Sequence, residues 1–378
     1  MIVLALVSFA IWIYLIVGRG GFWRSKDTDE PVVDMVTREW PSVFAIVPAR
    51  DESDVIAQTI KSLLKQDYPG SFRVVLVDDN SSDGTANVAG AAAADNRLAI
   101  LPGQSLPGGW TGKLWALSQG IDFAQTTAPI YYWLSDADIV YRPDTLRTMV
   151  LRAEKTSLAS VSLMAHLRCQ SPAERLLIPA FIFFFQMLYP FRWVNDARKA
   201  TAAAAGGCIL VRRDSLEKIG GITSIRSALI DDCALASRLK QSGGKIWLGL
   251  SRRAESIRIY DYFADIRHMV ARSAYAQLGY SPLLLLGTLL GMGVVYVAPP
   301  AIALLGCPFA RYVALVTWIC MALSFMPTLK FYSASWLLAP LLPLIAACYI
   351  GFTLDSALQY LARRGGLWKG RVQAPRDA

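Results

Sequence analysis

The hydrophobic and polar positions divide the chain into an apolar beginning, an alternating middle part and an apolar end. Residues 2–17 form an apolar run without charge, which predicts a membrane anchor over residues 1–23. The three later apolar stretches are residues 283–306, 312–329 and 335–354. Each has roughly the length of a membrane-spanning helix. Together they predict a C-terminal membrane region over residues 282–358.

Between these ends, short apolar runs alternate with helical patterns. The runs that predict β-strands are residues 43–47, 72–77, 98–101, 130–134, 206–211 and 245–250. The segments that predict helices are residues 54–66, 85–95, 113–123 and 231–241, the first with Ser53 as its N-cap. Strand–helix–strand units of about thirty residues are typical of right-handed βαβ connections. Residues 42–260 are therefore predicted to form an α/β domain with a mostly parallel sheet.

The segments around this domain are predicted to adjoin a membrane. Residues 24–41 are a polar linker, residues 261–281 an interfacial amphipathic segment, and residues 359–378 a basic tail. Residues 176–189 are apolar but too short to span a bilayer. They form either a buried helix or a helix in the membrane interface that brings a lipid to the site, and the Phe-rich sequence slightly favours the second.

Basic residues next to the apolar runs indicate the orientation. Arg19, Arg24 and Lys26 follow the first run, which fits a signal anchor whose basic flank is cytoplasmic. This predicts a multi-pass protein of the inner (cell) membrane with a cytoplasmic α/β domain. The basic tail also predicts a cytoplasmic C-terminus, which conflicts with three full spans. Either one stretch is re-entrant or interfacial, or the tail lies outside.

Composition narrows the chemistry. Hydrophobic residues make up 54% of the chain and the mean hydropathy is +0.36, too high for a purely soluble protein. The net charge of +9 is dispersed and no nucleic-acid motif accompanies it, so no nucleic-acid partner is expected. The six cysteines form no CxxC pair, which predicts free, buried thiols and no zinc site. With only two histidines, acid–base chemistry is expected to fall to carboxylates.

The buried run at residues 130–134 ends in Ser135-Asp136-Ala137-Asp138. Two carboxylates at the end of a buried strand suit a ligand site at the carboxyl edge of an α/β sheet. In extended geometry both point the same way and offer hard oxygen ligands to a divalent cation. The competing interpretation is a pair of solvated acids that precede a helix.

Other acidic pairs occur at predicted strand ends or a helix start, namely Asp51-Glu52, Asp78-Asp79 and Asp231-Asp232. A single such pair is explained by the helix macrodipole. Four clusters at the same predicted sheet edge favour a shared site.

These segments resemble the successive motifs of family 2 glycosyltransferases, which have the GT-A fold. The motifs are VPARDE at residues 47–52, VDDNSSDGT at 77–85, SDAD at 135–138 and IDD at 230–232. PGGWTGKLWAL at residues 107–117, together with the anchor and membrane tail, is similar to hopene-associated glycosyltransferases and, more distantly, to ceramide glucosyltransferases.

The resemblance implies a role for individual residues. Glu52, Asp79 and Asp136 would bind the nucleoside, Asp138 a Mg²⁺ or Mn²⁺ ion, and Lys113 a phosphate, with Trp110 beside it. Asp232 would be the general base, with Asp231 where the family more often has Glu, and Gly207 would belong to the loop beneath the acceptor. The family's Gln-x-x-Arg-Trp element, which helps hold the diphosphate, is reduced here to Arg272, which would contact a phosphate. The loss of the Trp argues against a processive polysaccharide synthase.

The sequence therefore predicts a membrane-anchored, inverting, metal-dependent glycosyltransferase. Its donor would be a nucleotide sugar, UDP-linked by expectation, and its acceptor a lipid hydroxyl, with a hopanoid suggested by the resemblance. One alternative is a polyprenyl-phosphate sugar transferase, which needs no general base. Another is a non-catalytic membrane scaffold that keeps a nucleotide-sugar fold.

Overall fold

The computed structural model describes residues 1–30 and 39–372. The chain divides into two compact units. The α/β unit comprises Asp27–Arg168 and Trp193–Ile259, and the helical unit comprises Met1–Lys26, Cys169–Arg192 and Tyr260–Ala378. The α/β unit is thus interrupted in sequence, whereas a continuous domain was predicted over residues 42–260. The predicted linker and basic tail lie partly outside the described residues.

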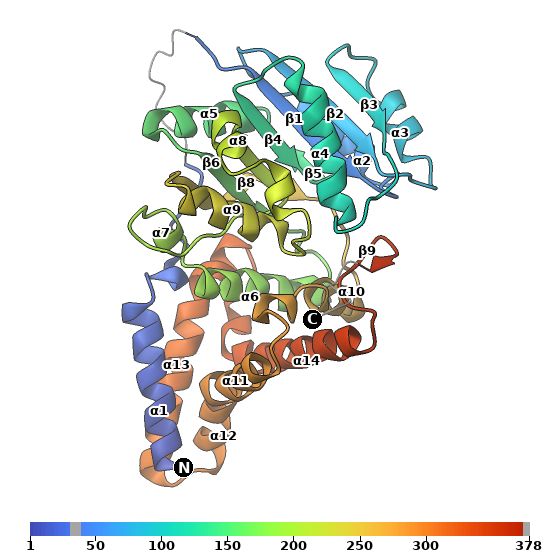
Figure 1. Cartoon of the computed structure of the whole chain (residues 1–378). Helices are drawn as coiled ribbons and strands as arrows, with labels where there is room; N and C mark the ends of the chain where they lie inside the picture. The colour runs from blue at the N-terminus through green and yellow to red at the C-terminus, as the bar shows by residue number, and fades with distance from the viewer. Residues whose placement is uncertain (31–38, 373–378) are drawn as a thin grey trace. The chain divides into compact units, whose positions relative to one another are not determined.

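An eight-stranded sheet forms the centre of the α/β unit, in the order β3-β2-β1-β4-β7-β6-β8-β5 (Figure 1). The strands are β1 (Val43–Ala49), β2 (Phe72–Asp78), β3 (Leu98–Pro102), β4 (Tyr131–Ser135), β5 (Ile139–Tyr141), β6 (Ser160–His166), β7 (Cys208–Arg212) and β8 (Ile246–Ser256). The pairs β1–β2, β1–β4, β2–β3 and β6–β8 are parallel, whereas β7 runs antiparallel to β4 and β6, and β5 to β8. The predicted α/β class with a mostly parallel sheet is confirmed.

The strand register determines where the acidic clusters lie. Ala49 of β1 is level with Asp78 of β2, and Ile46 of β1 is level with Leu134 of β4. Because these three strands are parallel, their carboxyl ends meet at one edge of the sheet. The polar residues that follow β1, β2 and β4 therefore gather at that edge.

The helices of the α/β unit pack apolar faces against the sheet. They are α2 (Ile56–Leu64), α3 (Thr85–Ala92), α4 (Gly112–Gln125), α5 (Thr145–Thr156), α8 (Arg213–Lys218) and α9 (Asp231–Gln241). On α2 the apolar residues Ile56, Ile60, Leu63 and Leu64 are buried in the main core. The cap predicted for α2 is wrong, because its N-cap is Val55 and no side chain caps it. The Ser53 amide instead donates to Asp83 Oδ2 at 2.9 Å.

Strand β8 extends beyond its predicted end at residue 250. Arg253, one of the charged residues beyond that position, is paired within the unit. Arg253 donates through Nε to Asp144 Oδ2 at 2.9 Å and lies 3.2 Å from Asp29 Oδ2 through Nη1. This strand continues to Ser256 and so brings the residues after it to the sheet edge.

The helical unit contains α1 (Ile2–Ile13), α6 (Pro172–Leu188), α7 (Phe191–Val194), α10 (Phe263–Ala271), α11 (Pro282–Met292), α12 (Ala298–Leu305), α13 (Pro308–Phe331) and α14 (Leu342–Leu361). Helix α7 is divided between the two units, because the boundary falls between Arg192 and Trp193. A π-helical turn, Gly293–Val297, joins α11 to α12. The Trp12 indole donates to the Val295 carbonyl in this turn at 2.8 Å. This bond connects the first helix to the C-terminal region.

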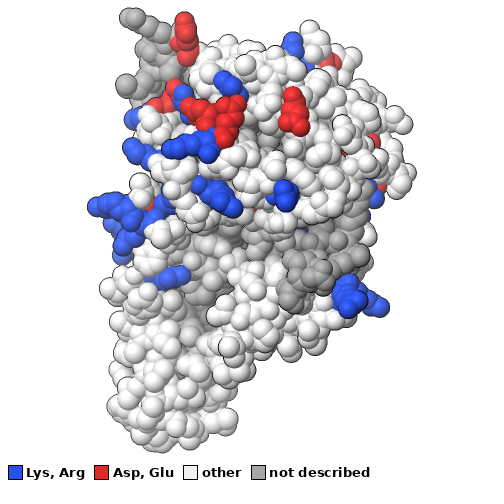
Figure 2. All heavy atoms as spheres, in the orientation of Figure 1, with Lys and Arg blue, Asp and Glu red and all other residues white. Residues whose placement is uncertain are grey.

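Four helical segments among the described residues are long and apolar enough to cross a membrane. They are Pro172–Val194, Pro282–Leu305, Pro308–Phe331 and Trp336–Leu361. On the face drawn in Figure 2, no Lys, Arg, Asp or Glu is seen around the start of α1 or the connection from α12 to α13. The three predicted C-terminal stretches thus reappear as spanning-length helices, and the segment containing α6 joins them.

Helix α6 is largely buried within the helical unit, so the buried-helix interpretation describes it better than an interface helix. Its N-terminus carries a capping box, in which Ser171 Oγ accepts from the Glu174 amide at 3.1 Å and Glu174 Oε2 accepts from the Ser171 amide at 2.9 Å. Phe183 and Phe184 are buried. All six cysteines lie among the described residues as free thiols, as predicted. The predicted burial holds only for Cys208, because Cys307 is exposed and the other four are half-buried.

Candidate active site at the carboxyl edge of the sheet

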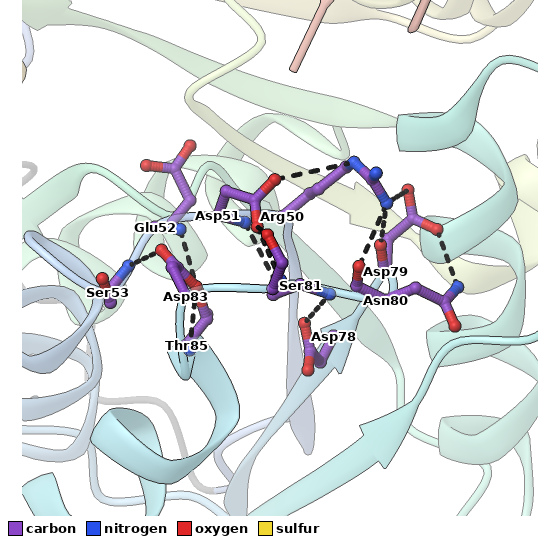
Figure 3. A network of polar contacts seen from close by, with 11 residues as sticks. Arg50, Asp51, Glu52, Ser53, Asp78, Asp79, Asn80, Ser81, Asp83 and Thr85 are labelled. Atoms are coloured by element: carbon purple, nitrogen blue, oxygen red, sulfur yellow. Dashed lines mark hydrogen bonds and ion pairs between the residues drawn. The ribbon is translucent and has the colours of Figure 1, made fainter. Parts of the chain in front are cut away.

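The loops after β1 and β2 hold one another by side chain–backbone hydrogen bonds (Figure 3). Asp51 Oδ1 accepts from the Ser82 amide at 2.8 Å, and the Asp51 amide donates to Ser81 Oγ at 3.0 Å. The Glu52 amide donates to Thr85 Oγ1 at 2.8 Å. Asp51 also has a φ of +50°, in the left-handed region that non-glycine residues seldom occupy. The two loops therefore form one interlocked structure that fixes Glu52.

Asp79, at the end of β2, is 1% exposed. Its amide donates to the Ala49 carbonyl at 2.8 Å, which places it beside the end of β1. Its own carbonyl accepts from Arg50 Nη1 at 2.5 Å (Figure 3). Arg50 was not predicted, and it contributes a positive charge at the predicted nucleoside position.

Lys113, near the start of α4, connects two of the acidic clusters. Its Nζ lies 2.8 Å from Asp136 Oδ1 and 3.1 Å from Asp231 Oδ2. Desolvation acts to lower the pKa of Lys113, but the charges of Asp136 and Asp231 outweigh it and the pKa is raised. Burial also raises the pKa of Asp136, against the effect of Lys113. The lysine is thus a charged ammonium group among carboxylates, and its predicted contact with a phosphate stays a prediction.

Asp232 follows Asp231 in the first turn of α9. Its Oδ2 accepts from the Gly206 amide at 2.8 Å and its Oδ1 from the Cys233 amide at 2.7 Å. Burial, reinforced by the charge of Asp231 and opposed by Lys113, raises the pKa of Asp232 to about 6. A carboxylate held by two amides, with a pKa close to neutral, is suited to accept a proton.

The Gly206-Gly207 pair allows this close packing. A Cβ atom at Gly206 would lie 3.2 Å from Lys113 Nζ and 3.4 Å from Asp232 Oδ2. A Cβ atom at Gly207 would lie 3.1 Å from Cγ1 of Ile139. The prediction that this pair adjoins the site agrees with its position, although its contact with an acceptor is untested.

A cavity opens between these groups. Its lining combines charged residues with an apolar wall from α4, α9 and the segment before α9. The lining includes Lys113, Asp136, Asp231 and Asp232 together with Leu114, Leu117, Ile222, Ile225 and Leu235. The polar part can hold an anionic or hydroxyl-bearing group, while the apolar part can exclude water.

Asp138 is held by an arginine that the sequence analysis missed. Arg258 Nε donates to Asp138 Oδ2 at 3.1 Å, and Arg258 Nη2 donates to Glu52 Oε2. Arg258 comes two residues after the end of β8. Desolvation acts to lower the pKa of Arg258, but the charges of Asp138 and Glu52 outweigh it and the pKa is raised. A basic residue just beyond a strand end was the available sequence signal.

The remaining predicted residues are Trp110 and Arg272. Trp110 precedes α4 and packs against Trp115 with their ring centroids 5.2 Å apart and the rings steeply inclined. Arg272 belongs to the helical unit, at the C-terminal end of α10, where its amide donates to the His268 carbonyl at 3.1 Å. Neither geometry tests the predicted contacts with substrate.

Among the described residues, no group of three or more His, Cys, Asp or Glu side chains could hold a metal ion. Asp136 and Asp138 nevertheless offer carboxylate oxygens at the same edge. Mg²⁺ is commonly held by one or two carboxylates together with substrate phosphates. The donor set therefore fits a divalent cation that is completed by a diphosphate.

Known proteins share this architecture. Residues 44–220 match the model for glycosyl transferase family 2. The probable glycosyltransferase YdaM of Bacillus subtilis is 25% identical over 64% of this chain and 57% of its own length. A beta-monoglucosyldiacylglycerol synthase of Trichormus variabilis is 26% identical over 53% of this chain and 41% of its own length. The chain thus spans less than two thirds of these curated relatives.

A solved structure resembles nearly the whole chain. It is mannosyltransferase PcManGT from Pyrobaculum calidifontis, in complex with GDP-Man and Mn²⁺. The TM-score is 0.58 at 19% identity, and the match covers 92% of this chain and 98% of that one. At this identity the likeness establishes the fold.

The sheet with its acidic carboxyl edge defines a GT-A glycosyltransferase fold. Within that class, residues 44–220 match glycosyl transferase family 2. The predicted family and fold are confirmed. The closer resemblance to hopene-associated enzymes stays a prediction.

Proposed function

We propose that this protein is a membrane-bound, inverting glycosyltransferase that moves a sugar from a nucleotide sugar to a lipid hydroxyl. The observation that carries the proposal is Asp232. It is a half-buried carboxylate, oriented by two amides, that lines a cavity together with Lys113 and Asp136 of the region that matches family 2. A scaffold without catalysis has no need of such a group.

The chemistry follows from the positions of the charged groups. Asp232 accepts the proton of the acceptor hydroxyl as its oxygen bonds to the anomeric carbon. The bond from that carbon to the nucleotide diphosphate breaks, and the electron pair leaves with the diphosphate. Lys113 keeps the carboxylates Asp136 and Asp231 in place and lowers the local negative charge that the diphosphate meets. Glu52 and Asp79 border the position proposed for the nucleoside.

A Mg²⁺ or Mn²⁺ ion fits beside Asp138, with Asp136 close by in the sequence. When bound, such an ion neutralises the charge that develops on the leaving diphosphate. PcManGT carries Mn²⁺ with GDP-Man, which is consistent with this assignment. For this chain we propose a UDP-linked donor, because a carboxylate such as Glu52 can accept the uracil N–H.

A lipid acceptor is supported by the apolar helices. Four segments of spanning length among the described residues suit an enzyme whose acceptor is already in the bilayer. One relative is a synthase of a glucosyl lipid. We propose an inner-membrane location with the α/β unit in the cytoplasm, where nucleotide sugars are available. Within the lipid class, the resemblance suggests a hopanoid.

The proposal is tested by incubating the full-length protein in detergent with extracted membrane lipids and radiolabelled UDP- or GDP-sugars. Labelled product that enters the organic phase, requires Asp232, and shows a lipid plus one hexose by mass spectrometry would support it. Label transferred only to lipid phosphates would favour the polyprenyl-phosphate alternative. The absence of transfer from any nucleotide sugar to any lipid fraction would contradict the proposal.

A further inference from the structure

Arg258 is the residue of the acidic edge that the proposed reaction leaves without a role. Its guanidinium joins Glu52, in the loop after β1, to Asp138, after β4. The three side chains are largely shielded from solvent, with exposures of 23% for Arg258, 10% for Glu52 and 18% for Asp138. Shielding makes this pairing stronger than one on an open surface.

The guanidinium occupies one of the two Asp138 oxygens that a metal could use. Arg258 Nε lies 3.1 Å from Asp138 Oδ2. A divalent ion bound to the same oxygen would place two positive centres in near contact, which is unfavourable at partly buried positions. Metal and guanidinium therefore compete for Asp138.

The backbone around this pair is fixed, which leaves the side chain as the part able to move. The Ile257 amide donates to the Asp138 carbonyl at 2.9 Å, so the chain before Arg258 is attached to the loop after β4. The guanidinium is joined to that backbone by a flexible stem with several rotatable bonds. It can leave Asp138 and keep its second partner, Glu52, without any movement of the sheet.

We propose that Arg258 is an internal counter-cation that neutralises Asp138 in the metal-free enzyme and must withdraw when a divalent cation binds. This inference rests on the proposed metal position at Asp138. Its consequence is that the protein binds Mn²⁺ weakly on its own, since each binding event has to break an existing ion pair. Arg258 is thus a positioning residue that sets metal affinity.

The test is Mn²⁺ binding to the full-length protein in detergent without nucleotide, measured from the free-ion signal in electron paramagnetic resonance. Arg258→Gln removes the competing charge and should bind Mn²⁺ about ten- to hundredfold more tightly, the range expected for hydrogen bonds to charged groups. Arg258→Lys keeps a positive charge but cannot bridge both carboxylates. Its Mn²⁺ affinity should therefore fall between those of the wild type and Arg258→Gln.

A matched control is Arg252→Gln, which removes one positive charge from an exposed position of β8. Its affinity should stay within about twofold of wild type, because exposed charges are screened. Adding Asp138→Asn to Arg258→Gln should abolish the gain. Thermal unfolding of each variant checks that it is folded, and Arg258→Lys serves if Arg258→Gln does not fold.

The outcomes separate this inference from the proposed function. Equal or weaker Mn²⁺ binding by folded Arg258→Gln would overturn the competition and leave the glycosyltransferase proposal standing. Retention of the gain in the Asp138→Asn double variant would also overturn it, since the metal would then bind elsewhere. If no protein of the set binds Mn²⁺ either without nucleotide or with UDP added, the metal assignment at Asp138 fails together with the inference.

Discussion

The substitution Asp232→Asn tests whether the carboxylate of Asp232 is the general base on which the proposed reaction depends. The change keeps the size of the side chain but removes its ability to accept a proton. It also changes the local hydrogen bonds, because both carboxylate oxygens accept from backbone amides, at 2.8 Å from Gly206 and 2.7 Å from Cys233. Asparagine has one acceptor oxygen, so its NH₂ group must face one of those two donors.

These contacts allow the effects on stability and on catalysis to be estimated separately. One buried amide left without a partner costs about 1–3 kcal/mol of the free energy of unfolding. Removal of a buried negative charge offsets part of that loss. Losing a general base lowers the rate of transfer by about a hundred- to ten-thousandfold. We therefore expect a folded, modestly destabilised protein whose transfer rate falls at least about a hundredfold.

The assay is radiolabelled-sugar transfer to extracted lipid, together with calorimetric UDP binding and thermal unfolding of both proteins. UDP binding should be almost unchanged, because Asp232 accepts from the Gly206 and Cys233 amides and not from the predicted nucleoside residues. Asp214→Asn is the matched control. It makes the same substitution at an exposed acid of the α/β unit, which is paired with Arg212 at 3.0 Å, and should transfer normally.

Near-normal transfer by a folded Asp232→Asn protein would refute the assignment of the base. It would support either a helix-terminal role for this acid, since Asn caps helices about as well as Asp, or an acceptor that is already anionic. Loss of UDP binding in parallel with transfer would show instead that the substitution disturbs the donor site.

Three further predictions follow from the site and the apolar ends. Burial raises the pKa of Asp232 to about 6, and only the ionised form accepts a proton. The value of kcat/KM should therefore be constant above pH 7 and fall as the pH drops through 6. A pH profile of kcat/KM that is flat down to pH 5 would contradict this. Asp138→Ala should abolish transfer, and EDTA should stop the wild-type enzyme until Mn²⁺ or Mg²⁺ is restored; full activity of metal-free enzyme would disprove the metal assignment. Deletion of residues 1–17 should leave the protein in the membrane fraction, because Pro282–Leu305, Pro308–Phe331 and Trp336–Leu361 remain; recovery in the high-speed supernatant would refute the anchoring argument.

The first half of the sheet was predictable because its strands are buried. β1 and β4 are apolar over nearly their whole length, and each is followed by a polar segment. Parallel strands then bring those segments together, so that the acidic edge follows from the strand order. The predicted helix at residues 231–241 has the bounds of α9.

Other elements were missed for identifiable reasons. Helix α5 has many polar residues, although Leu146, Met149, Val150 and Ala153 form a buried face with helical spacing. Strand β6 was missed although six of its seven residues are buried, because serines interrupt its apolar sequence. The serine hydroxyl of residue 162 accepts from the Ala205 amide at 2.8 Å, a long-range contact that local pattern cannot reveal.

Arg258 shows where local pattern fails most clearly. Its two partners lie 120 and 206 residues away in the chain. A basic residue in the segment SIRIY is equally compatible with a solvated strand end. Its role depends on β8 continuing past Arg253 to the sheet edge, which in turn depends on the ion pairs of that residue with Asp29 and Asp144.

The discontinuous helical unit has a consequence for synthesis of the chain. Phe183 on α6 contacts Phe325 with ring centroids 5.3 Å apart, and Phe184 contacts Tyr349 at 5.0 Å. Both partners emerge from the ribosome after the sheet is complete at Ser256. Until α13 and α14 have been synthesised, the aromatic rings on α6 therefore lack these partners and must be covered by lipid or a chaperone. A nascent chain without α14 would thus lack the partner of Phe184 at the centre of the helical unit, and quality-control proteases would recognise the chain at that position.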